Sequence, residues 1–120
     1  MAVRFEVEGT PRAKGRPRFN RNNGSIYTPK ATLEYERLIA YRCKSAMNKA
    51  RLKPFKGLVK VEVNVYFKGK SLRPDLDNVI KAILDGMNGV AYEDDQQVSE
   101  LIAKKHYKGL PKTEITVTEI

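Results

Sequence analysis

Apolar and polar residues alternate along several stretches of the chain, and this period of two predicts β-strands with one buried face. The clearest stretch is Leu58–Phe67, where valines occupy every second position. Val3–Glu8 alternates in the same way. Two further strands are predicted near the end of the chain, over residues 98–107 and around residues 115–118.

Two other stretches have helical spacing. Thr28 as N-cap and Pro29 as first helical residue predict a helix that runs to about Arg51. The second helix begins with Asp75 at its N-cap and Asp77 in its first turn. Its apolar residues form a complete face at positions i, i+3, i+4, i+7, i+8 and i+11, namely Leu76, Val79, Ile80, Ile83, Leu84 and Met87.

This order of elements predicts an α+β fold. A strand, a long loop, a helix, a strand, a helix and two strands imply a single mixed, mostly antiparallel sheet of about four strands, with two main helices on one face. A chain of 120 residues is most simply one domain, so we expect residues 1–120 to fold together.

Composition excludes several classes of protein. A single cysteine, Cys43, excludes an internal disulfide framework and a multi-cysteine zinc site. The only histidine, His106, lies on a predicted strand, which favours a structural role. The N-terminus does not resemble a signal peptide, and no apolar run approaches the ~18 residues of a membrane span. We therefore expect a cytoplasmic protein.

Charge is distributed unevenly. The chain carries a net charge of +9, but residues 71–100 contain seven acids and two bases, a balance of −5. The rest of the chain therefore carries +14. Such a basic background is typical of proteins that bind nucleic acid, although a solvated basic surface is the alternative.

The loop over residues 10–27 concentrates this positive charge. It contains no acid, and Phe19 and Tyr27 are interleaved with its bases. Such a loop can neutralise phosphates and stack on exposed bases, or it can simply be a mobile solubilising loop. Asn23-Gly24 favours a tight turn and hence a small β-ribbon. The candidate phosphate-binding residues of the loop are Arg12, Lys14, Arg16, Arg18 and Arg21, and Arg73 and Asn78 join them from the start of the acidic helix.

The acidic residues are candidates for a metal site. Asp75 and Asp77 can converge beyond the end of the helix, and a second cluster that includes Asp95 follows after a short turn. Carboxylate and amide oxygens suit Mg²⁺ or Mn²⁺, so we expect the two acidic clusters to meet and hold such an ion. An EF-hand is excluded, because position twelve counted from Asp75 is Gly86 instead of glutamate.

A metal beside a basic surface points to phosphodiester hydrolysis, in which Lys81 would add a fixed positive charge. The alternative is that Asp75 only caps the helix and that Asp77 and Lys81 form a surface ion pair.

Two blocks of sequence resemble the RusA-type Holliday junction resolvases. Asp75-Leu76-Asp77-Asn78 followed by Lys81-Ala82 is similar to the family's first signature, and Asp94-Asp95-Gln96-Gln97-Val98 is similar to its second. The resemblance implies a homodimer that cuts four-way DNA junctions with Mg²⁺, for which Mn²⁺ would substitute. It implies that Asp75, Asp77 and Asp95 are catalytic acids that hold the metal ion, and that Lys81 has a transition-state role.

Two other functions stay open at this point. One is a non-catalytic, basic nucleic-acid-binding protein whose aspartates are helix caps. The other is a nuclease that acts on RNA or on simple branched DNA.

Overall fold

A four-stranded sheet forms one layer of the protein, in the order β1-β6-β4-β5. The structure is a computed structural model that describes residues 1–15, 18–70 and 72–120, with Arg18 described for its backbone alone. The strands span Ala2–Glu8 (β1), Val59–Tyr66 (β4), Val98–His106 (β5) and Lys112–Glu119 (β6). Two of the three strand pairs are antiparallel and β4–β5 is parallel, so the predicted mixed, mostly antiparallel sheet is confirmed.

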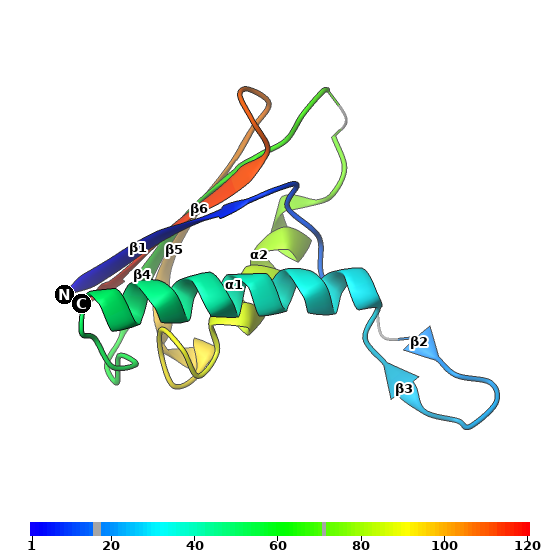
Figure 1. The fold of residues 1–120 in the computed structure, drawn as a ribbon, viewed down its shortest axis with the longest axis horizontal. Coiled ribbons are helices and arrows are strands. Elements are labelled where there is room, and N and C mark those ends of the chain that lie inside the picture. Colours follow the sequence, from blue (N-terminus) through cyan, green and yellow to red (C-terminus); the bar gives the residue numbers. More distant parts are fainter. Residues whose placement is uncertain (16–17, 71) are drawn as a thin grey trace.

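Two helices pack on the sheet and complete the predicted α+β fold (Figure 1). Helix α1 spans Lys30–Lys49, and α2 spans Leu76–Met87. Helix α2 is the crossover that joins the parallel strands β4 and β5, which cannot be joined by a tight turn. It therefore runs back along the sheet from the end of β4 to the start of β5.

The buried face of the sheet follows the predicted alternation. Every second residue of β4 from Val59 to Val65 is at most 1% exposed. Val7 of β1, together with Ile115 and Val117 of β6, belongs to the same core as the inward residues of both helices. Each such fully buried aliphatic side chain contributes about 1.5–3 kcal/mol to folding.

The start of α1 differs from the prediction. Pro29, not Thr28, occupies the N-cap position, and the helix begins at Lys30. The backbone of Pro29 has ψ 143°, an extended value that a first helical residue cannot have. Leu33, an apolar residue of the first turn, is 38% exposed and lies outside the buried face of the helix.

Polar residues take part of the buried face of α1 instead. Tyr35 is buried, and its hydroxyl shares a 2.7 Å hydrogen bond with the hydroxyl of buried Thr113 on β6. Burial raises the pKa of Tyr35 to about 12. Because each hydroxyl satisfies the other, the pair is tolerated in the core, and apolar periodicity alone does not predict it.

His106 has the structural role expected from the sequence, and Cys43 also lies in the packed interior. Cys43 is fully buried on α1, and burial raises the pKa of its thiol to about 12. His106 forms a 2.8 Å hydrogen bond between its Nε2 and Oδ1 of Asn64, and its ring stacks on Tyr66. Neither side chain therefore supplies a nucleophile or a zinc ligand.

Two smaller features complete the fold. Strands β2 (Arg18–Phe19) and β3 (Ile26–Tyr27) form the small ribbon that Asn23-Gly24 predicts. A short 3₁₀ helix, η1, spans Asp95–Gln97 before β5. Within the described ranges, neither helix is long and apolar enough to cross a membrane.

Helices α1 and α2 approach each other closely at Gly86. A Cβ atom at this position would lie 2.9 Å from the Glu36 carbonyl oxygen and 2.9 Å from Cβ of Ile39. Such distances do not occur between packed atoms, so only glycine allows this helix crossing without a shift of α1.

We expect Gly86→Ala to lower the free energy of unfolding by about 1–2 kcal/mol, because the overpacking of the helix contact exceeds the helix propensity that alanine gains. Urea unfolding would measure the change. Gly57→Ala is the matched control, since a Cβ there meets nothing closer than 4.0 Å. Equal stability of Gly86→Ala and the wild type would contradict the close crossing.

Candidate functional site

The acidic residues at the start of α2 lie on the surface. Asp75 occupies the N-cap position with extended φ −65° and ψ 136°, and Asp77 lies in the first turn, as predicted. Both side chains are exposed. In the structure as described, the Asp75 carboxylate caps no helical N–H group, so its position is not explained by a capping bond.

The exposed side of α2 and the edge strand β5 enclose a groove that contains three of the predicted site residues, Asp77, Asn78 and Lys81. Apolar residues line the rest of it, from α2 and from Leu101 and Ala103 of β5. Among the ion pairs of the described residues, none joins Asp77 to Lys81. Asp77 and Lys81 therefore do not form the surface ion pair that was the alternative to a functional role.

The basic N-terminal segment passes beside the same end of α2. The backbone N–H of Lys14 donates a 2.8 Å hydrogen bond to the carbonyl of Asn78 in the first turn. Arg12, Lys68 and Arg73 line one surface pocket together with Pro74, directly before Asp75. Cationic side chains from the N-terminal segment and from the loop between β4 and α2 thus lie next to the acidic helix start.

Lys68 was not singled out from the sequence. It lies just after the carboxyl end of β4, and in a strand–helix–strand unit this end faces the amino end of the connecting helix. That rule is the signal that could have identified Lys68 as a neighbour of Asp75.

Lys14 itself forms two ion pairs. Its Nζ donates a 2.9 Å hydrogen bond to Oε1 of Glu36 on α1 and lies 3.1 Å from Oδ2 of Asp85 on α2. Burial alone would lower the pKa of Lys14, but the hydrogen bonds and charges of Glu36 and Asp85 outweigh it and raise the pKa above 10.5. A role for Lys14 in phosphate binding stays a prediction, because in the structure two carboxylates neutralise its charge.

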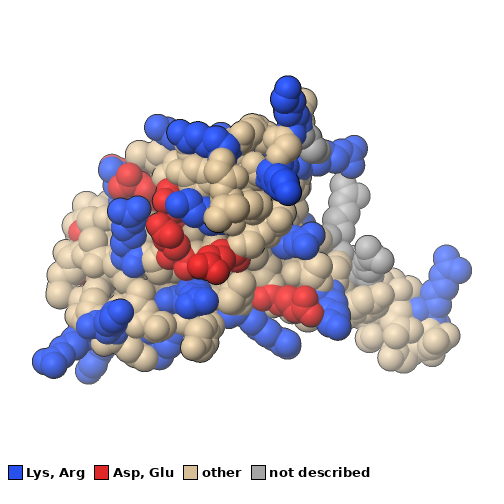
Figure 2. All heavy atoms as spheres, turned by 45° about the horizontal axis from the view of Figure 1, so that its top comes forward, with Lys and Arg blue, Asp and Glu red and all other residues tan. Residues whose placement is uncertain are grey.

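Figure 2 shows how charge is distributed on one face of the molecule. Lys and Arg side chains are spread widely around this face and reach the end of the ribbon, while Asp and Glu gather in a central group. Arg21, in the turn of the ribbon, is exposed. Arg16 and the side chain of Arg18 lie outside the described residues, so their predicted contacts with phosphate stay predictions.

Asp95 begins η1, after the C-terminal end of α2. Side-chain bonds of Gln97 hold this turn: its Oε1 accepts the backbone N–H of Asp94 at 2.9 Å, and its Nε2 donates to the Phe55 carbonyl at 2.7 Å. Gln97 thus has a structural role that the sequence signature did not reveal. Asp94 occupies the N-cap of η1, and Asp95 is half-buried.

The position of Asp95 relative to α2 can be traced through Tyr92. The Tyr92 hydroxyl donates a 2.7 Å hydrogen bond to the carbonyl of Leu84, in the C-terminal half of α2. Asn88, directly after α2, is paired with Tyr92 in an isolated β-bridge, so Asp95, which begins η1 shortly after Tyr92, lies near this end of the helix. Burial raises the pKa of Tyr92. Leu84 is about 13 Å further along the helix axis than Asp75, at 1.5 Å per residue.

The three predicted metal ligands are therefore not gathered within one chain. Asp75 and Asp77 lie at the amino end of α2, and Asp95 lies beyond its carboxyl end. The described part of the chain contains no group of three or more Asp, Glu, His or Cys side chains that could hold a metal ion. The donor types suit Mg²⁺, but one chain alone does not provide the complete set.

We expect Lys14→Gln to lower the free energy of unfolding by about 1–2 kcal/mol, more than an exposed pair and less than a fully buried one. Folding raises the pKa of Lys14. The two ion pairs therefore stabilise the fold fully below pH 10.5, and this stabilisation is lost as the pH rises above that value. Urea unfolding at pH 7 and at pH above 11 would show the difference from the wild type shrink.

Lys30→Gln is the matched control for this change. Lys30 and Glu34 are 3.8 Å apart with side chains 90% and 62% exposed, so its loss should cost less than about 0.5 kcal/mol. Equal effects of the two substitutions would show that Lys14 does not anchor the helices.

Comparison with known proteins agrees with the resemblance of the two signatures. The family model of endodeoxyribonuclease RusA matches residues 8–118, a range that includes every candidate site residue. Uncharacterized protein YqaN of Bacillus subtilis (strain 168) is 30% identical over an aligned length of 146 residues. The alignment covers 98% of this chain and 96% of that protein. The chain therefore belongs to the RusA endodeoxyribonuclease family and is a nuclease.

Proposed function

We propose that this protein is a Mg²⁺-dependent endonuclease that resolves Holliday junctions by paired cleavage during DNA recombination and repair, acting as a homodimer in the cytoplasm. The observation that carries the proposal is the bond from the Lys14 N–H to the Asn78 carbonyl. It ties the basic N-terminal segment to the acidic start of α2, so that groups for holding a polyanion and groups for holding a cation lie side by side.

The basic pocket has the chemistry of a phosphate site. Arg12, Lys68 and Arg73 line it, with no acid among its lining residues, and guanidinium and ammonium groups neutralise DNA phosphates. DNA held there would pass the amino end of α2. The Lys81 ammonium group, in the adjacent groove, would then favour a phosphate that gains negative charge.

Asp75 and Asp77 are the residues that would hold Mg²⁺ at this end of the helix. The ion would supply a more acidic bound water and neutralise charge on the phosphate. Asn78 in the same groove offers an amide to the ion or to a phosphate oxygen.

A homodimer would complete the site. Since Asp95 lies at the other end of α2, we propose that the partner subunit's Asp95 joins Asp75 and Asp77 as the third carboxylate. A two-fold symmetric dimer would then present two such sites, matching the two symmetric strands of a four-way junction.

We expect Asp75→Asn and Asp95→Asn each to reduce cleavage of a labelled four-way junction by at least about 100-fold, since each removes a carboxylate worth several kcal/mol of charge stabilisation. Binding of the junction should persist or tighten, because a negative charge near phosphate is lost. Chelation of metal should stop cleavage by the wild type, and added Mg²⁺ or Mn²⁺ should restore it.

Glu93→Gln is the control, since Glu93 is an exposed acid that neighbours Asp94 but has no assigned role. If cleavage and binding disappear together in Asp75→Asn, the aspartates are structural caps. The protein would then be a non-catalytic nucleic-acid-binding protein, and the proposal would be wrong.

Mixing the two inactive variants tests the shared site. In a dimer of one Asp75→Asn chain and one Asp95→Asn chain, one of the two sites would contain only intact carboxylates. After subunit exchange, half of the dimers are mixed, so nicking should return to about a quarter of the wild-type rate. Paired cuts should not return, because each mixed dimer has a single active site.

If the mixture is as inactive as either variant alone, each site draws its acids from one chain. Co-expression of two differently tagged chains, followed by purification through both tags, would ensure that mixed dimers are present in the assay.

A further inference from the structure

The ribbon of β2 and β3 extends away from the sheet and from α1 (Figure 1). Its two strands have two residues each, and its turn is closed by a 2.8 Å hydrogen bond from the Asn20 N–H to the Ser25 carbonyl. A ribbon of this size has no core of its own. Its exposed side chains therefore contribute little to folding and are available for contacts outside the chain.

Large apolar side chains cover this ribbon although it faces solvent. Phe19 is 64% exposed, Ile26 is 74% exposed and Tyr27 is 47% exposed. Phe19 and Ile26 lie directly opposite each other in the antiparallel pair, so their side chains project from the same face. Tyr27 projects from the other face, because successive residues of a strand alternate.

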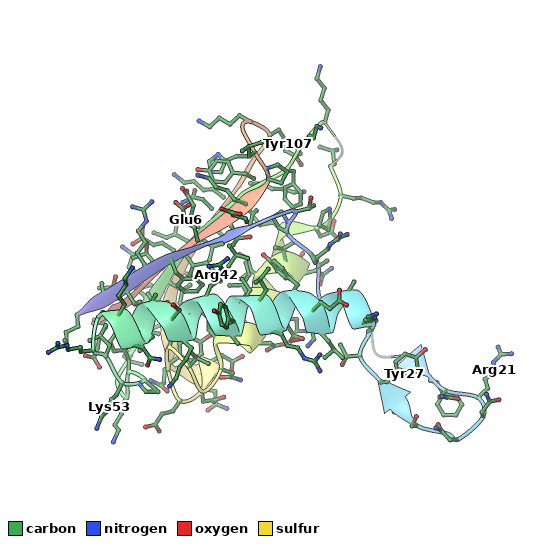
Figure 3. The ribbon with its side chains drawn as sticks, viewed as in Figure 1. Glu6, Arg21, Tyr27, Arg42, Lys53 and Tyr107 are labelled. Atoms are coloured by element: carbon green, nitrogen blue, oxygen red, sulfur yellow. The ribbon has the colours of Figure 1, made fainter. Side chains whose placement is uncertain are left out.

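Charge selects among the partners that could cover these side chains. Residues 15–29, which contain the ribbon, have three arginines and no Asp or Glu. Figure 3 shows Arg21 at the outer end of the ribbon and Tyr27 on β3. The same basic segment of a second copy would bring like charge to like charge at this surface, whereas a polyanion would not.

Exposed aromatic rings beside cationic groups are suited to bases that are not paired in a duplex. Every base has a π-face on which a ring can stack, and the adjoining backbone carries the phosphates that the cations neutralise. A paired base inside a duplex offers no such face. The ribbon therefore has the chemistry to distinguish unpaired from paired DNA.

We propose that the β2–β3 ribbon binds unpaired bases, with Phe19 and Tyr27 as stacking side chains and Arg21 as a contact to the adjoining phosphate. This inference rests on the proposed function for its biological setting, since base pairs at the branch point of a junction open more easily than base pairs inside a continuous duplex. It assigns the ribbon to substrate recognition and places it outside the cleavage site at α2.

The chain contains no tryptophan, so a single introduced indole reports on the ribbon without background. We expect the emission of Phe19→Trp to be quenched by an oligothymidylate of about 12 nucleotides and far less by a duplex of equal length. Tyr41→Trp is the matched control, because Tyr41 is 66% exposed but lies on α1. Its emission should change little with either DNA.

Phe19→Ser combined with Tyr27→Ser should weaken binding of the same oligothymidylate by about 5-fold or more, and duplex binding by less than about 2-fold. Fluorescence anisotropy of labelled DNA measures both affinities. Unchanged affinity for oligothymidylate would overturn the inference, and so would equal losses for both forms of DNA.

Two other occupants give distinct results. If the Phe19→Trp emission shifts to the blue as protein concentration rises without DNA, the ribbon contacts a second copy. If it shifts only with vesicles of anionic phospholipid, the ribbon contacts a membrane surface. Either result overturns the inference. Because oligothymidylate contains no junction and is not cut, these measurements are independent of whether the cleavage proposal holds.

Discussion

The ion pairs of the Lys14 ammonium group with Glu36 and Asp85 join three parts of the chain that are far apart in sequence. They hold the basic N-terminal segment against both helices, 2.9 Å and 3.1 Å from the two carboxylates. The backbone bond from Lys14 to Asn78 lies next to them. The position of Arg12, two residues away, relative to the start of α2 depends on this anchor.

The crossover connection determines where the acidic residues can lie. Because β4 and β5 are parallel, α2 must return along the full sheet between them. One end of α2 then belongs to the loop after β4, which contributes Lys68 and Arg73, and the other end leads into η1 with Asp95. Acids that follow closely in sequence are thereby separated in space, and this separation is the physical reason for proposing a site shared by two subunits.

The sequence was most informative where one physical effect decides the structure. Burial of every second residue predicts β4, and the apolar face of α2 predicts its extent and the positions of Asp75 and Asp77. The start of α1 was placed at Thr28, because a cap and a proline favour helix locally, whereas the observed backbone of Pro29 is extended.

Long-range pairs were not predictable in this way. Local pattern places Lys14 in a loop that contacts phosphate, because its carboxylate partners are 22 and 71 residues away along the chain and local pattern does not show them. The same limit applies to the Tyr35–Thr113 pair. Helical periodicity likewise places residues on faces but does not report that Asp95 lies beyond the far end of α2.

The burial of Cys43 has a practical consequence for studying the protein in solution. Its thiol has no accessible surface, and its raised pKa keeps it protonated at neutral pH, so maleimide reagents would not modify it in the folded state. A cysteine introduced elsewhere on the surface would then be the sole point of attachment for a dye or spin label. Distances between subunits or between protein and DNA become measurable without first replacing a native residue of the core.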